Sequence, residues 1–461
     1  MAHREEPSLL DRGLRVFADV RNGEGFSALL LALNVFLILM AYYVLKPVRE
    51  ALVLGEGSAE LKSYLSAGQV VLLAFVVPFY GKLVARLPRM KLINTVTLFF
   101  AACPVIFYGL AKAGVPLAVI FFIWIGIFSL MVIAQFWSFA ADIYTKEEGE
   151  RLFPIVGFGA SLGAVFGAQI ADQLIEPIGV YELMLVASAI LLGQLALTNY
   201  INGRRAPRAA VQPAATSTST ATPTAAPPKP SGANAFALVF RTRYLLLMAL
   251  MLMMLNWVNS TGEFILGRIV TETAQRMVAD GTAAGLTPGQ LIGDFYSKYF
   301  TMVNGLGLLL QLFVVSRVVK RFGIPVAVMI LPVLSLTAYN VMLFIPLMWA
   351  VLSAKVAENA TDYSLNNTVR QMLFLPCTPE QKYSAKQAID SFFFRAGDVL
   401  SAATVFVGSA IVPLGTTGFA AVNVALAVAW VALAWQVGRT YRGLTAEAPA
   451  VAVQRPATAG A

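Results

Sequence analysis

The chain has 461 residues, of which 58% are hydrophobic and 13% are charged, and its formal net charge is +9. A mean hydropathy of +0.71 excludes a soluble globular protein and predicts an integral membrane protein. With two cysteines, His3 as the sole histidine and no block of basic residues, the composition argues against a disulfide scaffold, a metal-dependent or histidine-based enzyme and a nucleic-acid-binding protein.

Twelve apolar stretches follow one another along the chain, each long enough to cross a bilayer as a helix. They are Ser27–Leu45, Leu65–Ala85, Leu92–Leu110, Val115–Ile143, Phe153–Ile175, Tyr181–Ile201, Tyr244–Gly267, Phe295–Val315, Pro325–Phe344, Leu347–Arg370, Ala388–Ile411 and Phe419–Val437. No signal-peptide cleavage pattern follows the first stretch, so we expect it to be retained. The sequence therefore predicts an all-α membrane protein with twelve transmembrane helices.

The segment between the sixth and seventh stretches, Gly203–Asn234, is rich in Ala, Pro, Thr and Ser and contains basic residues but no acid. Such a segment cannot bury enough apolar surface to become ordered. We therefore predict four regions. They are an N-terminal six-helix bundle over residues 1–202, a flexible cytoplasmic linker over 203–234, a C-terminal six-helix bundle over 235–442 and a disordered tail over 443–461.

Lys and Arg are concentrated in the connections on one side of the predicted bundles. Gly81–Arg86, between the second and third stretches, has a basic counterpart in Ser316–Arg321, between the eighth and ninth. This weak repeat is typical of two parallel halves. The positive-inside rule then places both termini in the cytoplasm. We expect the protein in the cell (inner) membrane. The alternative is that an odd number of spans makes the bias accidental. Lys46, Arg49 and Lys62 run against the trend, which suggests that they serve a site.

Polar residues gather at helical spacing in the first, fourth, seventh and tenth stretches. A charge at the bilayer centre costs about 2.5–3.5 kcal/mol, so we expect these stripes to face a central aqueous cavity. Each stripe occupies one side of its helix. The residues are Tyr42, Lys46 and Arg49; Gln135, Ser138 and Asp142; Asn256, Asn259, Ser260 and Glu263; and Lys355, Glu358, Asn359, Asp362, Asn366 and Arg370.

Structural explanations for these patterns remain open. Buried hydrogen bonds and ion pairs between helices would also produce polar stripes. Lys46 and Arg49 would sit at a membrane edge, where such side chains snorkel to lipid headgroups. The ladder Gly159, Gly163 and Gly167 predicts close helix packing, at an interface that slides or rocks during transport, rather than a phosphate loop, because no strand precedes it.

The arrangement of two six-helix halves resembles the major facilitator superfamily, in which helices 1, 4, 7 and 10 line the cavity. Within it, Leu45–Val53, Phe136–Ile143 with Arg151–Ala160, and Ala385–Asp390 with Arg395–Gly397 resemble the nucleotide translocases, the ATP/ADP carriers of plastids and intracellular bacteria. In that family a basic residue after helix 1, acids in helices 4 and 7 and a lysine opening helix 11 are implicated in nucleotide exchange. The resemblance assigns these roles to Arg49, Asp142, Asn259 and Lys386.

The chain departs from the family pattern around the seventh stretch, where an amide stands in place of an acid and Glu263 stands where the family has a lysine. A ligand rich in phosphate needs concentrated positive charge. Here acids nearly balance the five cations of the site. The cations are Lys46, Arg49, Lys355, Lys386 and Arg395, and the acids are Asp142, Glu263, Glu358, Asp362 and Asp390. The resemblance therefore indicates the family more firmly than the substrate.

We predict a secondary active transporter that works by alternating access and exchanges nucleotides or a related anionic metabolite. One alternative is a proton-coupled transporter of another solute or drug, with Glu358 and Asp362 as coupling acids. Another is a non-transporting sensor or scaffold, whose polar stripes would be closed ion pairs. We expect a monomer in the lipid bilayer with a small-molecule substrate, no cofactor and no enzymatic activity. The predicted substrate-binding residues are Lys46, Arg49, Gln135, Asp142, Asn256, Asn259, Glu263, Lys355, Glu358, Asp362, Asn366 and Lys386.

Overall fold

The computed structural model describes residues 20–21, 24–211, 232–345, 347–378, 381 and 385–453, and within these ranges the regular structure is entirely helical. The α-helices are α2 (Gly25–Glu56), α3 (Ala59–Arg86), α4 (Arg89–Lys112), α5 (Ala118–Ile143), α6 (Lys146–Ile178), α7 (Glu182–Val211), α8 (Gly232–Arg241), α9 (Arg243–Ala279), α10 (Pro288–Phe313), α11 (Val315–Phe322), α12 (Ile324–Phe344), α13 (Met348–Thr361), α14 (Asn367–Met372), α15 (Lys386–Ala388), α16 (Phe394–Phe406) and α17 (Thr416–Val453). Three π-helical segments are η1 (Asp362–Asn366), η3 (Ile389–Phe393) and η4 (Val407–Ile411). The predicted all-α class is confirmed.

Ten helices in the described ranges are long and apolar enough to cross a membrane, and the protein is a multi-pass membrane protein. The pair α10 and α11, bent by 47° at its break, makes eleven if it is one span. The predicted stretch Leu347–Arg370 is also helical, but η1 divides it into α13 and α14. The exact number of twelve spans therefore stays a prediction.

The chain divides into two compact units. The first contains Met1–Ser58, Val71–Ala221 and Val270–Asn304, and the second contains Ala59–Val70, Thr222–Ile269 and Gly305–Ala461. The start of α3 thus belongs to the second unit, whereas the end of α9 and most of α10 belong to the first. The predicted bundle boundaries stay a prediction.

The predicted linker and tail are only partly described. Residues 203–211 continue α7, Gly232 begins α8, and residues 212–231 lie outside the described residues. In the tail, α17 continues to Val453, and residues 454–461 lie outside the described residues.

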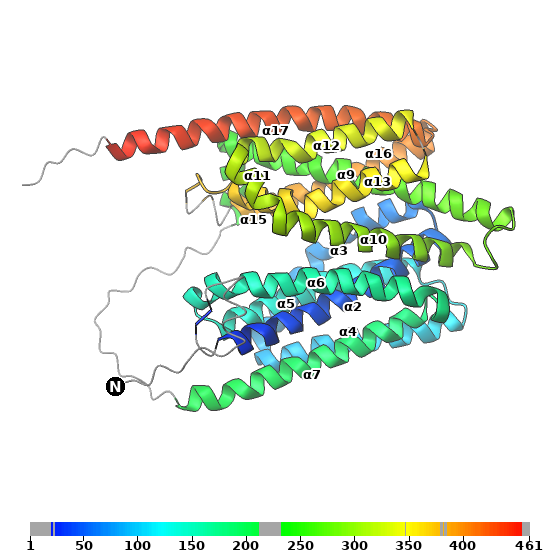
Figure 1. Cartoon of the computed structure of the whole chain (residues 1–461), viewed down its shortest axis with the longest axis horizontal. Helices are drawn as coiled ribbons and strands as arrows, with labels where there is room; N and C mark the ends of the chain where they lie inside the picture. The colour runs from blue at the N-terminus through cyan, green and yellow to red at the C-terminus, as the bar shows by residue number, and fades with distance from the viewer. Residues whose placement is uncertain are drawn as a thin grey trace, which may run out of the picture. The chain divides into compact units, whose positions relative to one another are not determined.

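The first unit is built around α2, which packs along α5, α6 and α7, while α4 packs against α7 (Figure 1). The glycine ladder lies where α6 meets α2. A Cβ atom added to Gly159, Gly163 or Gly167 would overlap a backbone carbonyl oxygen of Ala32, Phe36 or Met40, respectively. Only a hydrogen atom fits between the two backbones, which confirms the predicted close packing.

The second unit contains α12 packed between α13 and α17, together with η1, η3 and η4. A π-helical turn contains one more residue than an α-helical turn, and such turns are frequent at functional sites. The described part of the first unit has no π-helical segment. Irregular backbone is thus concentrated in the second unit, on the helices that carry Asp362 and Asp390.

Candidate functional site

The polar stripes predicted on the seventh and tenth stretches meet inside the second unit. Lys355 of α13 is fully buried, and its Nζ lies 2.8 Å from Glu358 Oε2 and 3.5 Å from Glu263 Oε1. The same Nζ donates a hydrogen bond of 3.1 Å to Asn259 Oδ1. Two helices, α9 and α13, therefore surround one buried ammonium group with two carboxylates and an amide oxygen.

Glu358 is held from the opposite side by α12. Ser335 Oγ donates to Glu358 Oε1 at 2.8 Å, and the Tyr339 hydroxyl lies 3.1 Å and 3.0 Å from the two carboxylate oxygens. Gly262 on α9 makes room for this arrangement, because a Cβ atom there would overlap the Tyr339 hydroxyl. A buried carboxylate is tolerated when it is both paired and hydrogen-bonded, and Glu358 meets both conditions.

Glu263 extends the cluster toward a more exposed position. Its side chain is 22% exposed, Lys62 Nζ lies 3.8 Å from its Oε2, and Asn359 Nδ2 donates to its Oε1 at 2.9 Å. Lys62 lies on the part of α3 that belongs to the second unit. We call Lys62, Glu263, Lys355 and Glu358 the ionic cluster. Two cations and two anions make it neutral overall.

Asp362 and Asn366 lie on η1, one turn beyond the ionic cluster. Asn366 Nδ2 donates a hydrogen bond of 2.7 Å to Asp362 Oδ1. The stripe was predicted with the 100° rotation of an ideal α-helix, and the π-helical turn changes that rotation after Thr361. Asp362 and Asn366 thus pair with each other on the same helix.

A second polar seam joins α9 to α16. Asn256 Nδ2 donates to the Phe394 carbonyl oxygen at 2.9 Å, and Ser260 Oγ donates to Asp398 Oδ1 at 2.8 Å. The helices approach closely at Gly397, where an added Cβ atom would lie 2.7 Å from the backbone nitrogen of Trp257. Asp398 was missed by the sequence analysis, although an acid inside an apolar span is itself a signal of function.

Lys386 lies apart from the ionic cluster. Its Nζ donates a hydrogen bond of 2.5 Å to Gln371 Oε1 and lies 5.7 Å from the centre of the Phe374 ring. Nearby in sequence, Arg370 Nε lies 3.8 Å from Asp390 Oδ1. The lysine that opens the eleventh stretch is thus held by a neutral amide and an aromatic ring.

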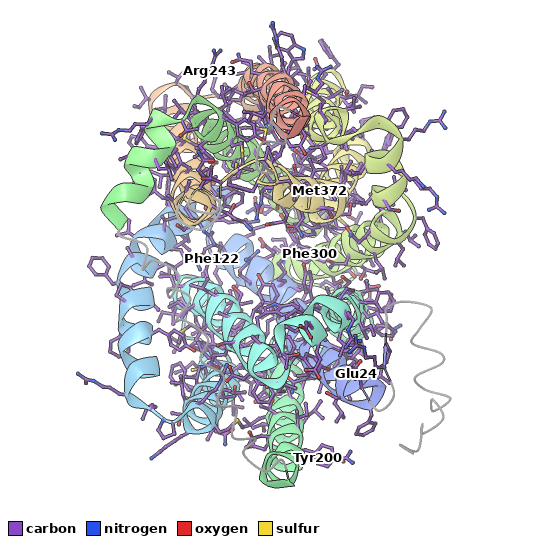
Figure 2. All side chains as sticks on the ribbon, turned by 90° about the vertical axis from the view of Figure 1, so that its left-hand side faces the viewer. Glu24, Phe122, Tyr200, Arg243, Phe300 and Met372 are labelled. Carbon is purple, nitrogen blue, oxygen red and sulfur yellow. The ribbon has the colours of Figure 1, made fainter. Side chains whose placement is uncertain are left out.

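In the first unit, Lys46 is buried among aromatic rings. Its Nζ lies 4.4 Å from the ring centre of Phe300, 4.6 Å from that of Tyr43 and 5.5 Å from that of Tyr42. Phe300 comes from α10 (labelled in Figure 2). Rings in such positions attract a cation through their electron-rich faces. Lys46 is therefore held inside the protein.

The expected position of Lys46 and Arg49 after the first helix is wrong. The helix α2 continues through Pro47 to Glu56, so both residues lie within it. Proline removes one helical hydrogen bond, but close packing of this buried helix keeps the backbone helical. Arg49 pairs with Glu50, and its guanidinium lies 5.3 Å from the centre of the Phe122 ring.

Asp142 and Gln135 lie at different depths on α5. Asp142 pairs with Arg89 at the start of α4, and Arg89 also donates to Ser138 Oγ at 2.9 Å. Asp142 is 47% exposed, whereas Gln135 is buried and lines a small cavity with Asn34. The polar stripe predicted on the fourth stretch is thus divided between the end of α5 and its interior.

The segment Arg151–Ala160 begins with a firmly held ion pair. Arg151 donates to both carboxylate oxygens of Glu24, at 2.9 Å and 2.8 Å. This pairing lowers the pKa of the Glu24 carboxyl, which lies just before α2. Thr145 and Glu148 form a capping box at the start of α6. These contacts fix where α2 and α6 begin relative to each other.

The structure brings together only part of the predicted substrate-binding set. Asn259, Glu263, Lys355 and Glu358 meet, with Lys62 as a partner that was assigned no role there. Lys46, Arg49, Gln135 and Asp142 lie in the first unit. In the second unit, Asp362 pairs with Asn366, and Asn256 and Lys386 have other partners. In the described residues, no three His, Cys, Asp or Glu side chains are grouped to hold a metal ion.

Comparison with known proteins identifies similar sequences. The family model described as TLC ATP/ADP transporter matches residues 117–441. ADP,ATP carrier protein 1 of Chlamydia pneumoniae is 22% identical over 342 residues, which cover 68% of this chain and 64% of that protein. The alignment thus spans less than two thirds of that relative. Lys46, Arg49 and Lys62 precede the residues that the family model matches.

Solved transporter structures share the fold at low sequence identity. The nucleoside transporter NupG is 14% identical with a TM-score of 0.60, over 91% of this chain and 98% of that chain. The POT family transporter PepTSo is 12% identical with a TM-score of 0.60, and a bacterial homologue of the iron transporter ferroportin is 15% identical with a TM-score of 0.58. The match to each of these two structures covers 90% of this chain and 98% of the solved chain. The predicted major-facilitator-like fold is confirmed.

Proposed function

Because this chain belongs to the TLC ATP/ADP transporter family, we propose that it is a secondary transporter that exchanges ATP-type and ADP-type nucleotides by alternating access. The single observation that carries this proposal is the family match over residues 117–441. The fold and the buried charges are consistent with it. Ionisable groups inside a membrane protein are costly and usually mark a transport pathway.

We assign the ionic cluster the role of balancing charge. Glu358 is fixed by Ser335, Tyr339 and Lys355, whereas Glu263 is partly exposed and is shared by two lysines. A carboxylate shared in this way can change partners at low cost, because one lysine remains when the other leaves. In this scheme Glu263 is the member that exchanges partners during the transport cycle.

We assign phosphate binding to a cation outside the ionic cluster. Lys386 is held by the neutral Gln371, and an anion competes with a neutral amide more easily than with a carboxylate. Lys46 lies against aromatic rings in the first unit, and Arg49 lies against the Phe122 ring but also pairs with the Glu50 carboxylate. We propose that Lys386 contacts the phosphates and that Asn256, Asn259, Asp362 and Asn366, in the same unit, orient the substrate or neighbouring side chains. Lys46, Arg49, Gln135 and Asp142 stay predicted substrate-binding residues of the first unit.

We further propose that the protein acts as a monomer in the inner membrane and that both termini are cytoplasmic. This orientation places the basic connections, including Arg86, Arg89 and Lys91, on the cytoplasmic side. The exchange needs no catalytic chemistry, so we expect a transporter without enzymatic activity or a bound cofactor.

Exchange in proteoliposomes tests the nucleotide assignment. Vesicles loaded with ADP, ATP, GTP or no nucleotide are mixed with labelled ATP, and saturable uptake is expected only when a nucleotide is inside. Lys386→Gln should raise the KM for ATP about tenfold, since it removes a charged hydrogen bond, and Lys386→Arg should restore most of the affinity. Lys298→Gln is the matched control, because Lys298 is exposed and pairs with Asp294 on the same helix.

Two outcomes would overturn the proposal. If folded protein gives no saturable uptake for any nucleotide, the nucleotide assignment fails. If it also gives no flux of other anions, the closed ion pairs of the ionic cluster are better explained by a non-transporting scaffold, which would have the same pairs.

A further inference from the structure

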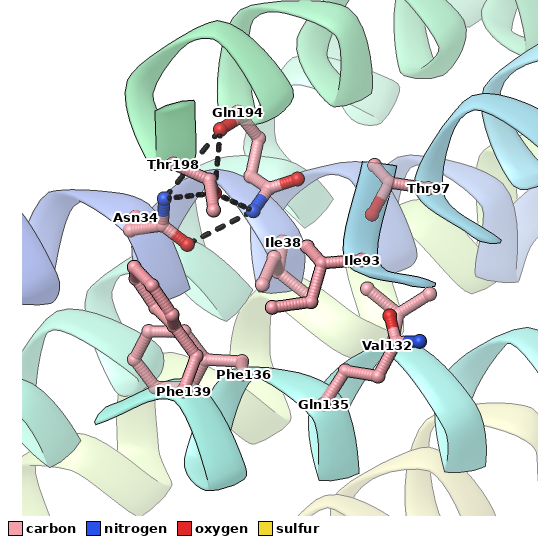
Figure 3. Close-up of a pocket in the computed structure, with 10 residues that line it drawn as sticks. All are labelled: Asn34, Ile38, Ile93, Thr97, Val132, Gln135, Phe136, Phe139, Gln194 and Thr198. Atoms are coloured by element: carbon pink, nitrogen blue, oxygen red, sulfur yellow. Dashed lines mark hydrogen bonds between the residues drawn. The ribbon is translucent and has the colours of Figure 1, made fainter. Parts of the chain in front are cut away.

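A small cavity lies inside the first unit, among α2, α4, α5 and α7 (Figure 3). It has room for about one water molecule. Apolar side chains form part of its wall, and buried neutral polar side chains form the rest. The polar residues are Asn34, Thr97, Gln135, Gln194 and Thr198.

One wall of the cavity is a closed hydrogen-bond network between α2 and α7. Asn34 Nδ2 donates to Thr198 Oγ1 at 2.8 Å, and Gln194 Nε2 donates to Asn34 Oδ1 at 2.9 Å. Thr198 Oγ1 in turn donates to the backbone carbonyl oxygen of Gln194 at 3.0 Å. These bonds orient the Gln194 amide, and its Oε1 is left without a hydrogen-bond partner.

Gln135 forms part of the opposite wall, on α5. It is 5% exposed, and neither its Oε1 nor its Nε2 has a hydrogen-bond partner. The Tyr80 hydroxyl approaches this amide but makes no hydrogen bond of normal geometry. Figure 3 shows the Gln135 amide pointing from α5 into the space between the helices. Buried polar atoms in native proteins are nearly always hydrogen-bonded, so these groups require a partner.

We propose that the cavity binds one water molecule that bridges α5 to the network between α2 and α7. The water hydrogen-bonds to the Gln135 amide and donates a hydrogen bond to Gln194 Oε1. The buried Thr97 hydroxyl of α4 offers a third partner. Buried waters typically make about three hydrogen bonds, which matches the groups available here.

The chemistry of the wall favours water over a cation. The lining residues include no carboxylate, so nothing would offset the charge of a cation in this apolar setting. Gln135 therefore positions α5 through water, and this inference does not depend on which substrate is transported.

A structure of the full-length protein at a resolution that reveals ordered water tests the proposal. In the unmodified protein, a density peak should lie within about 3.2 Å of both the Gln135 amide and Gln194 Oε1. Gln135→Met keeps the length of the side chain but removes both hydrogen-bonding groups, so the peak should disappear. Asn199→Leu is the control, since Asn199 lies on α7 outside the cavity and pairs with Asn94, and the peak should remain.

Three results would overturn the water site. These are an empty cavity in a well-ordered map of the unmodified protein, a peak that is unchanged in Gln135→Met, and an anomalous signal at this position after thallium replaces sodium. The last would assign the site to a monovalent cation. If Gln135→Met does not fold, Gln135→Leu provides the same comparison.

Discussion

The two units bury their polar groups in different ways. The first unit encloses a neutral amide network of Asn34, Gln194 and Thr198 between α-helices that contain no π-helical turn in the described residues. The second unit encloses the ionic cluster and contains η1, η3 and η4. The first unit also buries the charged Lys46 and Glu50, so the two units differ in how many charged groups meet at one place and in the regularity of their helices.

Under the proposed function, the difference favours the second unit as the one that changes its interactions. A buried ion pair contributes little net stability, because desolvation offsets the attraction between its charges. Stability alone therefore explains the four charges of the ionic cluster poorly. By contrast, the hydrogen bonds of the amide network are enough to explain why Asn34, Gln194 and Thr198 are buried. Under the proposed function, we infer that the second unit contains the groups whose pairing changes with substrate.

The largest expected effect is that of Lys355→Met in the second unit. It leaves Glu358 buried without its cation and should lower the free energy of unfolding by about 3–5 kcal/mol. The measurement is thermal unfolding in detergent. Lys355→Met combined with Glu358→Leu should recover most of the loss, because the pair Lys62 and Glu263 remains balanced. Equal melting temperatures for Lys355→Met and the unmodified protein would contradict the distinction between the units.

Tyr339→Phe sharpens the comparison within the ionic cluster. It removes one hydroxyl donor to the Glu358 carboxylate and should cost about 1.5–3 kcal/mol, since that acceptor is charged. Tyr64→Phe is the control in the same unit, because Tyr64 is exposed. A loss no greater than that of the control, measured by chemical or thermal unfolding, would argue that Glu358 is not held through Tyr339.

Gly163→Ala tests the regular packing of the first unit. The added methyl group would overlap the Phe36 carbonyl oxygen of α2, and overpacking of this kind costs about 1–3 kcal/mol. Gly157→Ala on the same helix has open space around it and should leave stability unchanged or slightly raised. If the two variants had the same melting temperature, the inferred close packing of α2 on α6 would be wrong.

Acid pH should affect the first unit weakly, through Glu24. Its pKa is lowered from an ordinary value of 4.5 by hydrogen bonding to Arg151. The pairing therefore stabilises the fold fully above about pH 4.5, and this contribution is lost as the pH falls through the lowered pKa. Glu24→Gln should remove that part of the acid dependence of melting. Glu147→Gln, an exposed site on α6, should retain it, and identical acid profiles for the two variants would contradict the assignment.

Much of the fold follows from the sequence because apolar length and helical period are local properties. The meeting of Asn259 and Glu263 with Lys355 and Glu358 also follows from two stripes that must avoid lipid. Other features depend on packing between distant segments. Pro47 does not end α2, because the buried helix is held by its neighbours, and η1 changes the register that an ideal helix assigns to the residues that follow it, such as Arg370.

Lys62 illustrates the same limit of sequence reasoning. Its charge runs against the trend of the short connections, which indicated a role but not a partner. Its pairing with Glu263 requires the start of α3 to belong to the second unit, and no local pattern encodes that assignment. Asp398 was missed although it has a local signal, an acid inside an apolar span with Arg395 three residues earlier; only its partner Ser260 is supplied by another helix, α9.

The exchange rate of Glu263→Gln tests the central claim most directly. Labelled ATP uptake into proteoliposomes loaded with ADP is compared for the unmodified protein, Glu263→Gln and Lys298→Gln at equal amounts of folded protein. We predict that Glu263→Gln lowers the exchange rate at least about tenfold, equivalent to 1.4 kcal/mol, while Lys298→Gln does not change it. Exchange by Glu263→Gln at the rate of the unmodified protein would contradict the functional role of the ionic cluster.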